Sequence, residues 1–305
     1  MAALAFSTTL NAQAPIARAR ARLLPCAAGG LPRLHLQDGP MDLIIMARGA
    51  REMVEAAYRA ARMRFLTILD ELTSELPLLR TAAGPCAPAA DGAIAQRMQC
   101  AVRPLTPWGF ITPMAAVAGA VAEEVLAAMP RAVPRLRLAA VNNGGDIALY
   151  LAEGERLAVG MVAKPEPTKP DLFARFEITA RDAARGIATS GWRGRSFSLG
   201  IADAVTVLAR TAAAADAAAT IIANTVDLPG HAGIQRVPAS SLQPDSDLGE
   251  QLVTRDVPTL QTGEVAEALA RGHARADALR HSGLILRAAL HLQGQTVISG
   301  DATDG

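Results

Sequence analysis

The stretch TAAAADAAATIIANTV, Thr211 to Val226, decides how this chain is interpreted. Its alanine-rich pattern predicts a helix in which Asp216 and Thr220, four residues apart, lie on one face. Almost every other side chain in it is small or apolar, so we expect this face to contact other backbone closely. A carboxylate removed from water needs a partner, which here is an arginine, backbone amides or a metal ion. Because both side chains offer oxygen, a metal would be magnesium holding a phosphate rather than zinc. The alternative is that Asp216 faces solvent and only makes the helix more soluble.

Composition excludes several classes of protein. The chain has 305 residues, 50% of them hydrophobic, which is enough to bury a full core. Its formal net charge is +1, so we expect no bulk attraction to nucleic acid or to an anionic membrane. No apolar run approaches the roughly 20 residues needed to span a bilayer. The cysteines Cys26, Cys86 and Cys100 are odd in number and lack metal-ligand spacing, which favours a reducing, cytoplasmic location without disulfides.

The order of strand and helix patterns predicts the fold class. An Asp38-Gly39-Pro40 turn separates two alternating runs, and helical periodicity then extends from Arg51 to about Arg80. The second half of the chain repeats this order of strands, helices and strands. Strands grouped with strands and helices with helices favour an α+β fold with antiparallel sheets. The further helices are expected near 94–102, 113–129, 212–226 and 264–281, and the strands near 135–151, 156–163, 172–178, 203–208 and 284–294.

The sequence also predicts the domain organisation of the chain. Residues 1–30 are expected to form a flexible, arginine-rich leader, and residues 31–300 one domain built of two related halves, about 31–165 and 166–300. The polar, turn-rich segment RVPASSLQPDSDLGE, residues 236–250, is expected as an excursion on the surface. Glu123 and Glu124 are expected on the wet side of their helix and receive no chemical role.

A first glycine-rich turn, Asn143-Gly144-Gly145-Asp146, separates two apolar strands. Glycines tolerate positive φ and let a ligand approach the backbone closely. The plainer alternative is a structural hairpin, since Asn-Gly is a common turn pair, with Asp146 capping only its own turn.

A second turn, Thr189-Ser190-Gly191, offers hydroxyls and exposed amides. Arg193 and Arg195 follow it and supply charge for a phosphate or a carboxylate. Trp192 either stacks on a planar ring or covers an edge of the core.

Three of these segments in order, NNGGDI (142–147), ATSG (188–191) and ADAAAT (215–220), with the strand pattern AVTVLA before the last, resemble the ApbE-like superfamily. Its best-known members are magnesium-dependent flavin transferases, which attach FMN from FAD to a protein threonine through a phosphoester. The sequence TSGWRGRSFSLGIADAVTVLA, with ITPMAAVAGAVAEEV upstream, looks more like a separate prokaryotic branch of that superfamily than like the transferases themselves. The resemblance runs from about Leu34 to Ser299.

The resemblance implies a duplicated T-fold-like architecture with the ligand in a cleft between the halves. The metal ligands of the transferases match Asp216 and Thr220 here, and a backbone carbonyl near residues 117–119 supplies another. Asp203 or Asp146 is expected to orient or deprotonate an acceptor hydroxyl, which requires burial to raise its pKa. The two glycine turns match the lining of the flavin-nucleotide cleft, so the expected cofactor-binding residues are Asn143, Gly144, Gly145, Thr189, Ser190, Gly191 and Arg195.

Two departures from the transferases bear on the expected reaction. Ala118 stands where they usually have a lysine, and Phe197 to Gly200 where they carry a histidine-containing segment. The alternatives are therefore a non-catalytic flavin- or pterin-nucleotide-binding protein, or a hydrolase or transferase acting on a related heterocyclic nucleotide. The expected partners are the nucleotide and, for a transferase, an acceptor flavoprotein. Exposed sheet edges also leave a homo-oligomer open.

Overall fold

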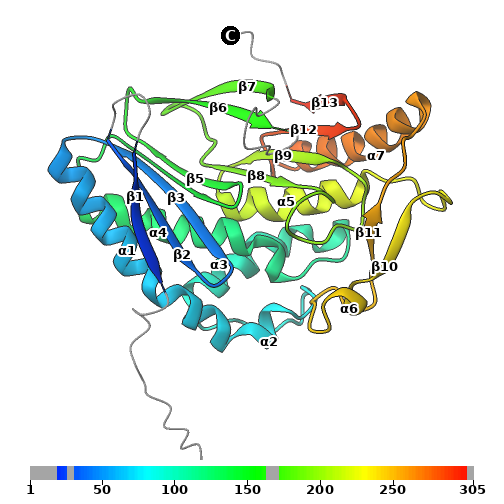
Figure 1. The fold of residues 1–305 in the computed structure, drawn as a ribbon, viewed down its shortest axis with the longest axis horizontal. Helices are drawn as coiled ribbons and strands as arrows, with labels where there is room; N and C mark the ends of the chain where they lie inside the picture. The colour runs from blue at the N-terminus through cyan, green and yellow to red at the C-terminus, as the bar shows by residue number, and fades with distance from the viewer. Residues whose placement is uncertain (1–18, 26–30, 163–171, 301–305) are drawn as a thin grey trace, which may run out of the picture.

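A computed structural model describes residues 19–25, 31–162 and 172–300 (Figure 1). A nine-stranded sheet forms its centre, and every neighbouring pair of strands in it is antiparallel. In spatial order the strands are β1 (Arg20–Leu24), β2 (Arg33–Asp38), β3 (Met41–Arg48), β4 (Leu138–Asn143), β5 (Asp146–Leu151), β8 (Gly186–Ser190), β9 (Ala204–Ala209), β12 (Arg287–Leu292) and β13 (Gln295–Ser299).

A layer of helices packs on one face of this sheet and forms the main hydrophobic core with it (Figure 1). The longer helices are α1 (Arg51–Ser74), α3 (Ala93–Val102), α4 (Val117–Ala132), α5 (Ala212–Thr225) and α7 (Thr262–His281). The short ones are α2 (Leu76–Leu79), α6 (Ala239–Leu242), η2 (Arg103–Trp108) and η3 (Pro113–Ala116). Small residues let α5 lie deep in this layer, and the Thr211 side chain caps its start by accepting the Ala214 amide at 3.2 Å.

The opposite face of the sheet carries a second, smaller core under a hairpin. This hairpin consists of β6 (Arg156–Val162) and β7 (Leu172–Thr179), which lie at the top of Figure 1, above β5 and β8. Ile178 from the hairpin packs with Leu149 and Leu208 from the sheet. Apolar side chains therefore point to both faces of the central strands.

The predicted α+β class with antiparallel sheets is confirmed. The order of elements also occurs twice: β2 and β3, helices including α1 and α4, then β4 and β5; and again β8 and β9, helices including α5 and α7, then β12 and β13. In each case the two hairpins lie side by side in the sheet and the helices cover one face. The division into two related halves stays a prediction that this topology fits.

Several boundaries differ from the expected ones. Arg20–Leu24 lie inside the expected leader but pair with β2 as an edge strand, so the sheet begins there. The helix expected to reach about Arg80 ends at Ser74, and α2 follows with a proline in its first turn. The expected excursion contains α6 between β10 (Gln235–Pro238) and β11 (Leu252–Asp256), and Asp245 within it pairs with Arg80 at 2.8 Å.

The cysteines and the one apolar helix bear on the expected location. Cys86 and Cys100 are free and exposed, whereas Cys26 lies outside the described residues. By length and composition alone, the helix Pro113–Ala132 could cross a membrane, with a mean hydropathy of 1.2. Half of it is buried inside the fold, as in a core helix of a soluble protein, so it is weak evidence for a membrane span.

Candidate functional site

Several polar side chains gather where β4 ends and β5 begins. Val141 and Ala148 belong to the core under the helices. Because side chains alternate along a strand, Asn143 and Asp146 face the same helix layer. Only 6% of Asn143 and 8% of Asp146 is exposed. Buried polar groups at this place need partners inside the protein.

Asn143 links the end of β4 to the start of α4. Its Nδ2 donates to the carbonyl oxygen of Ala118 at 3.2 Å, and its Oδ1 accepts the amide of Asp42 at 3.4 Å. Gly144 and Gly145 follow with φ of +66° and +120°, a region that favours glycine. The amide of Gly145 donates to Asn142 Oδ1 at 2.8 Å. The predicted hairpin turn is confirmed, and Asn142, not Asp146, accepts its amide.

Asp216 lies on α5 and meets the start of α4. Its Oδ2 accepts the Gly119 amide at 3.0 Å, and the residue is partly buried. A Cβ on Gly119 would lie 2.3 Å from the carbonyl oxygen of Ala212, so the backbones of the two helices touch there. Asp216 therefore does not simply face bulk solvent.

The carboxyl group of Asp216 is electrostatically costly to ionise. Burial, and then the negative charge of Asp146, raise the pKa of Asp216 well above its ordinary value. The backbone amides of Gly119 and Ala118 act in the opposite direction. Like charges brought together in a poorly solvated place favour a proton or a cation between them. Positive charge is therefore favoured at this site.

Asp146 is the second perturbed acid of the site. Burial raises the pKa of Asp146 to about 7, against the lowering effects of the Thr189 amide and of the charge on Arg195. The Thr189 amide donates to Asp146 Oδ1 at 3.2 Å. Asp146 thus ties the first glycine turn to the second, across the pairing of β5 with β8, and does not merely cap its own turn.

Arg195 joins two turns at this end of the sheet. Its Nη2 donates to the carbonyl oxygen of Pro40 at 2.7 Å. A Cβ on Gly144 would lie 3.3 Å from Arg195 Nη1, so the guanidinium lies directly over the glycine turn. The side chain is exposed. A positive charge therefore stands beside Asp146 and within reach of solvent.

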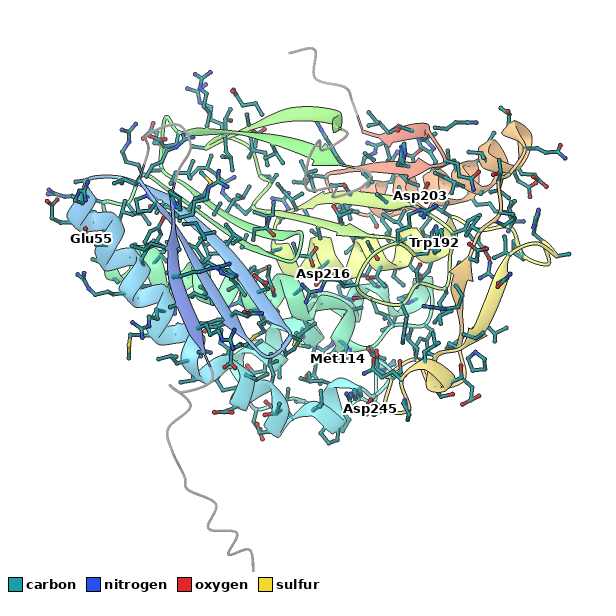
Figure 2. All side chains as sticks on the ribbon, in the orientation of Figure 1. Glu55, Met114, Trp192, Asp203, Asp216 and Asp245 are labelled. Carbon is teal, nitrogen blue, oxygen red and sulfur yellow. The ribbon has the colours of Figure 1, made fainter. Side chains whose placement is uncertain are left out.

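The loop after β8 is fixed by contacts of its own. Both carboxylate oxygens of Asp203 are occupied: Arg193 Nε donates to Oδ1 at 2.6 Å and the Gln293 amide donates to Oδ2 at 2.7 Å. The Arg193 guanidinium also lies 4.3 Å from the centroid of the Trp192 ring. Figure 2 shows Asp203 and Trp192 near each other and apart from Asp216. Asp203 thus anchors this loop to the β12–β13 turn.

The three residues of the expected second turn, Thr189, Ser190 and Gly191, make different contacts. Thr189 points its hydroxyl to Thr206 Oγ1 at 2.9 Å, so its amide rather than its side chain meets Asp146. Ser190 is partly buried. A Cβ on Gly191 would lie 2.5 Å from the Asp203 carbonyl oxygen, so glycine is needed there for close backbone approach.

The other residues singled out from the sequence lie on α5 and α4. Thr220 follows Asp216 by one helical turn and is partly buried. The expectation that Glu123 and Glu124 lie in solvent is wrong. Only 11% and 12% of their side chains is exposed, and both pair with Arg97, at 2.6 and 3.0 Å. Local sequence patterns did not indicate their burial, because the residues that pair with these glutamates come from other helices.

A cavity of about 440 Å³ lies on the other side of α5. Ala214 and Ala218 line it together with Arg97 and Cys100. Both alanines are two residues from Asp216, which places them roughly 200° around the helix from it. Glu123 and Ala213 also line the cavity, so it borders the α4–α5 contact.

The donor atoms near Asp216 are oxygens. Within the described ranges, no group of three or more His, Cys, Asp or Glu side chains is placed to hold a metal ion. Two carboxylates with neutral oxygens nearby are instead a set that suits Mg²⁺, which commonly takes one or two carboxylates and completes its shell with water and substrate phosphate. The donor chemistry fits magnesium.

Comparison with known proteins identifies the family. Residues 22–298 match the family described as AbpE bacteria. The chain belongs to this family. The expected membership of the ApbE-like superfamily is thereby confirmed.

Relatives of this AbpE-family chain include UPF0280 proteins of methanogens. The one from Methanothrix thermoacetophila is 38% identical over 185 residues, covering 60% of this chain and 73% of the relative. The one from Methanosarcina acetivorans is 40% identical over 119 residues, covering 39% and 44%. The one from Methanosphaerula palustris is 35% identical over 159 residues, covering 52% and 63%. The match to the last two spans less than two thirds of their length.

Two solved structures also align with the AbpE-family chain. The Pseudomonas stutzeri flavinyl transferase ApbE in its apo form is 13% identical, with a TM-score of 0.40 and coverage of 92% and 93% of the two chains. A mutant of the Vibrio cholerae flavin transferase ApbE is also 13% identical, with a TM-score of 0.41 and coverage of 92% and 96%.

Proposed function

We propose that this protein binds a flavin nucleotide together with Mg²⁺ and transfers FMN from FAD to a protein hydroxyl. The observation that carries the proposal is the meeting of Asp216, Asp146 and the Gly144 turn at one end of the sheet, where Asp216 lies partly buried beside a like charge. Membership of the AbpE family and the motifs that resemble FMN transferases supply the ligand class.

The metal would be held by Asp216 and Thr220, with the carbonyl oxygen of Ala118 as the nearby neutral donor. When bound, Mg²⁺ would neutralise charge on the pyrophosphate of FAD. The raised pKa of Asp216 supports this assignment, because a cation would relieve the repulsion from Asp146. Asn143 supports it from behind by holding the Ala118 carbonyl group.

The nucleotide would lie against the two glycine turns. Gly144 and Gly145 bring no side chains of their own to this turn, and Arg195, which lies over Gly144, supplies a positive charge for a phosphate. Thr189, Ser190 and Gly191 would form the second wall through their backbone.

In the transfer, the acceptor hydroxyl oxygen forms a bond to the phosphorus of the FMN moiety, the phosphoanhydride bond breaks, and AMP leaves. We assign the hydroxyl proton to Asp146. A carboxylate with a pKa of about 7 is partly ionised near neutral pH and is a stronger base than an ordinary aspartate. Asp203, whose two oxygens are both occupied, is instead assigned to positioning the 191–195 loop.

A second candidate, nucleotide binding without transfer, is favoured by two departures from the resembled transferases. Ala118 stands where they have a lysine, and Phe197 to Gly200 where they have a histidine-containing segment. A hydrolase that splits FAD in the same site is the third alternative from the sequence.

Product analysis separates these functions. Purified protein is incubated with FAD and Mg²⁺, with and without a coexpressed candidate flavoprotein, and the mixture is analysed by chromatography and mass spectrometry. AMP with an FMN-modified acceptor supports transfer. AMP with free FMN would mean hydrolysis, and bound but unchanged FAD would mean a binding protein. FAD that is neither bound nor consumed would overturn the flavin proposal. Asp146→Asn is expected to bind FAD and release no AMP.

A further inference from the structure

Two hydrogen bonds one helical turn apart join helix α4 to α5. The Gly119 amide of α4 donates to Asp216 Oδ2 at 3.0 Å, and the Ala213 amide of α5 donates to Glu123 Oε1 at 2.7 Å. Residues four apart on α4 and three apart on α5 lie on the same face of each helix. The two hydrogen bonds therefore fix both the separation and the register of the helices.

Glu123 satisfies a group that α5 cannot satisfy itself. The first amides of a helix have no acceptor within it, and Thr211 accepts only that of Ala214 at 3.2 Å. Glu123 brings a carboxylate from another helix to the amide of Ala213, one residue before Ala214, where negative charge is also favoured by the helix dipole. The start of α5 is thus capped from two sides.

Glu123 is itself held in place. Its Oε2 accepts Arg97 Nη1 from α3 at 2.6 Å, and only 11% of its side chain is exposed. One oxygen is bound to α3 and the other to α5. A carboxylate held this way has little freedom to move away from Ala213, and hydrogen bonds to an ionised group are strong.

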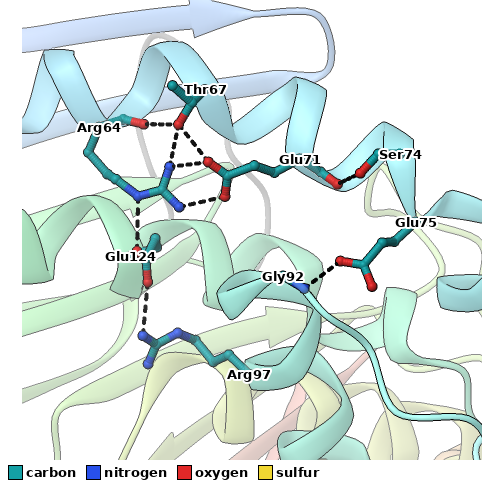
Figure 3. Close-up of polar contacts among 8 residues, drawn as sticks. All are labelled: Arg64, Thr67, Glu71, Ser74, Glu75, Gly92, Arg97 and Glu124. Atoms are coloured by element: carbon teal, nitrogen blue, oxygen red, sulfur yellow. Dashed lines mark hydrogen bonds and ion pairs between the residues drawn. The ribbon is translucent and has the colours of Figure 1, made fainter.

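The adjacent Glu124 provides an internal comparison. It accepts Arg64 Nε at 2.9 Å and Arg97 Nη2 at 3.0 Å, and 12% of its side chain is exposed (Figure 3). These ion pairs join α4 to α1 and α3 rather than to α5. The two glutamates therefore share burial, charge and Arg97; Glu123 also contacts α5, and Glu124 contacts Arg64 of α1 instead.

We propose that Glu123 is a positioning residue for the Asp216 site: it sets α5 against α4 so that the Asp216 carboxylate meets the start of α4. Its part in ligand binding rests on the proposed function, whereas its part in helix register does not. Without Glu123, the start of α5 loses one of its side-chain caps and the hydrogen bond from the Ala213 amide to α4. Loss of a residue that orients a metal ligand typically weakens metal binding about 10-fold or more.

The experiment compares Glu123→Ala, Glu123→Gln and Glu124→Ala with the wild-type chain. Amide hydrogen exchange is measured first, on the metal-free protein. Glu123→Ala is expected to speed exchange of the Gly119 and Ala213 amides about 10-fold, through local opening of the α4–α5 contact. Glu124→Ala is expected to leave both nearly unchanged. Glu123→Gln keeps an oxygen acceptor for Ala213 and is expected to restore most of the protection.

Calorimetric titration with Mg²⁺ in the presence of FAD gives the second measurement. Glu123→Ala is expected to weaken binding about 10-fold and Glu124→Ala about 2-fold or less. Unchanged exchange at Gly119 in Glu123→Ala would overturn the inference. Equal loss of Mg²⁺ affinity in Glu123→Ala and Glu124→Ala would do so as well. If wild-type protein binds neither Mg²⁺ nor FAD, the proposed function fails, and hydrogen exchange alone decides the role of Glu123.

Discussion

The Gly119 amide and the Asp216 carboxylate are hydrogen-bonded at 3.0 Å although they lie 97 positions apart in the chain. The contact is possible because glycine lets α4 approach the first residues of α5 to backbone distance. The residue that accepts the hydrogen bond is also the residue proposed to hold the metal. Packing of the helix layer and the chemistry of the site are therefore connected at one position.

Substitution of Gly119 tests this connection. A Cβ in Gly119→Ala would lie 2.3 Å from the Ala212 carbonyl oxygen, so the helices must separate. We expect the free energy of unfolding to fall by about 2 kcal/mol, as for other overpacked cores, and FAD binding to weaken with it. Urea unfolding measures the first effect. Gly263→Ala, in an α7 position with open space around it, is the control and should be neutral. Equal stability of both variants would contradict the close approach of α4 and α5.

The pKa of Asp146 predicts how stability depends on pH. Burial raises it from an ordinary value near 4 to about 7 in the folded protein. Between these values the folded chain holds a proton that the unfolded chain has released, so stability is lost as pH rises through this window. Asp146→Asn removes that loss. We expect the metal-free variant to match wild type at about pH 4 and to exceed it by a few kcal/mol at about pH 8.

Denaturant unfolding of both proteins at several pH values measures this difference. Burial also raises the pKa of Asp216, so some loss of stability with pH should remain in the variant. Parallel pH profiles for wild type and Asp146→Asn would show that Asp146 does not carry the raised pKa.

Asp203 is expected to act on structure rather than on the reaction. Asp203→Ala removes the acceptor of both Arg193 and the Gln293 amide, which should cost about 2 kcal/mol of stability. Asp203→Asn keeps the size of the side chain and one oxygen acceptor. Its rate of AMP release should therefore fall only as far as the fraction of folded protein falls. A thermal unfolding series with product analysis checks both variants. A stable Asp203→Asn protein that binds FAD and releases no AMP would instead identify Asp203 as the catalytic base.

Local patterns in the sequence predicted much of the fold. The spacing of apolar residues located α4, α5 and α7, and the Asn-Gly pair located the β4–β5 hairpin, because these features depend on neighbours within a few residues. The predicted helix to Arg80 was too long, since the proline after Glu75 starts a separate turn. The edge strand β1 was missed because its pairing with β2 stabilises a segment whose composition resembles a loose leader.

The candidate site was predictable in its residue types more than in its contacts. The four-residue spacing of Asp216 and Thr220 follows from helix geometry, and burial of an alanine-rich face was expected. The meeting of Asp146 with Thr189, and of Glu123 with Ala213, joins residues 43 and 90 positions apart. Such pairs depend on tertiary packing, and the periodicity of apolar residues along a single sequence does not reveal them. The same limit explains why Glu123 was assigned to solvent.

The most direct test is calorimetric titration of FAD into wild-type protein and Asp216→Ala, each with and without Mg²⁺. We expect Mg²⁺ to tighten FAD binding to wild type about 10-fold or more, since a metal held by Asp216 would neutralise charge on the pyrophosphate. We expect Asp216→Ala to lose this dependence on Mg²⁺. FAD binding that is independent of Mg²⁺ in wild type, or a magnesium effect that survives intact in Asp216→Ala, would contradict the proposed site.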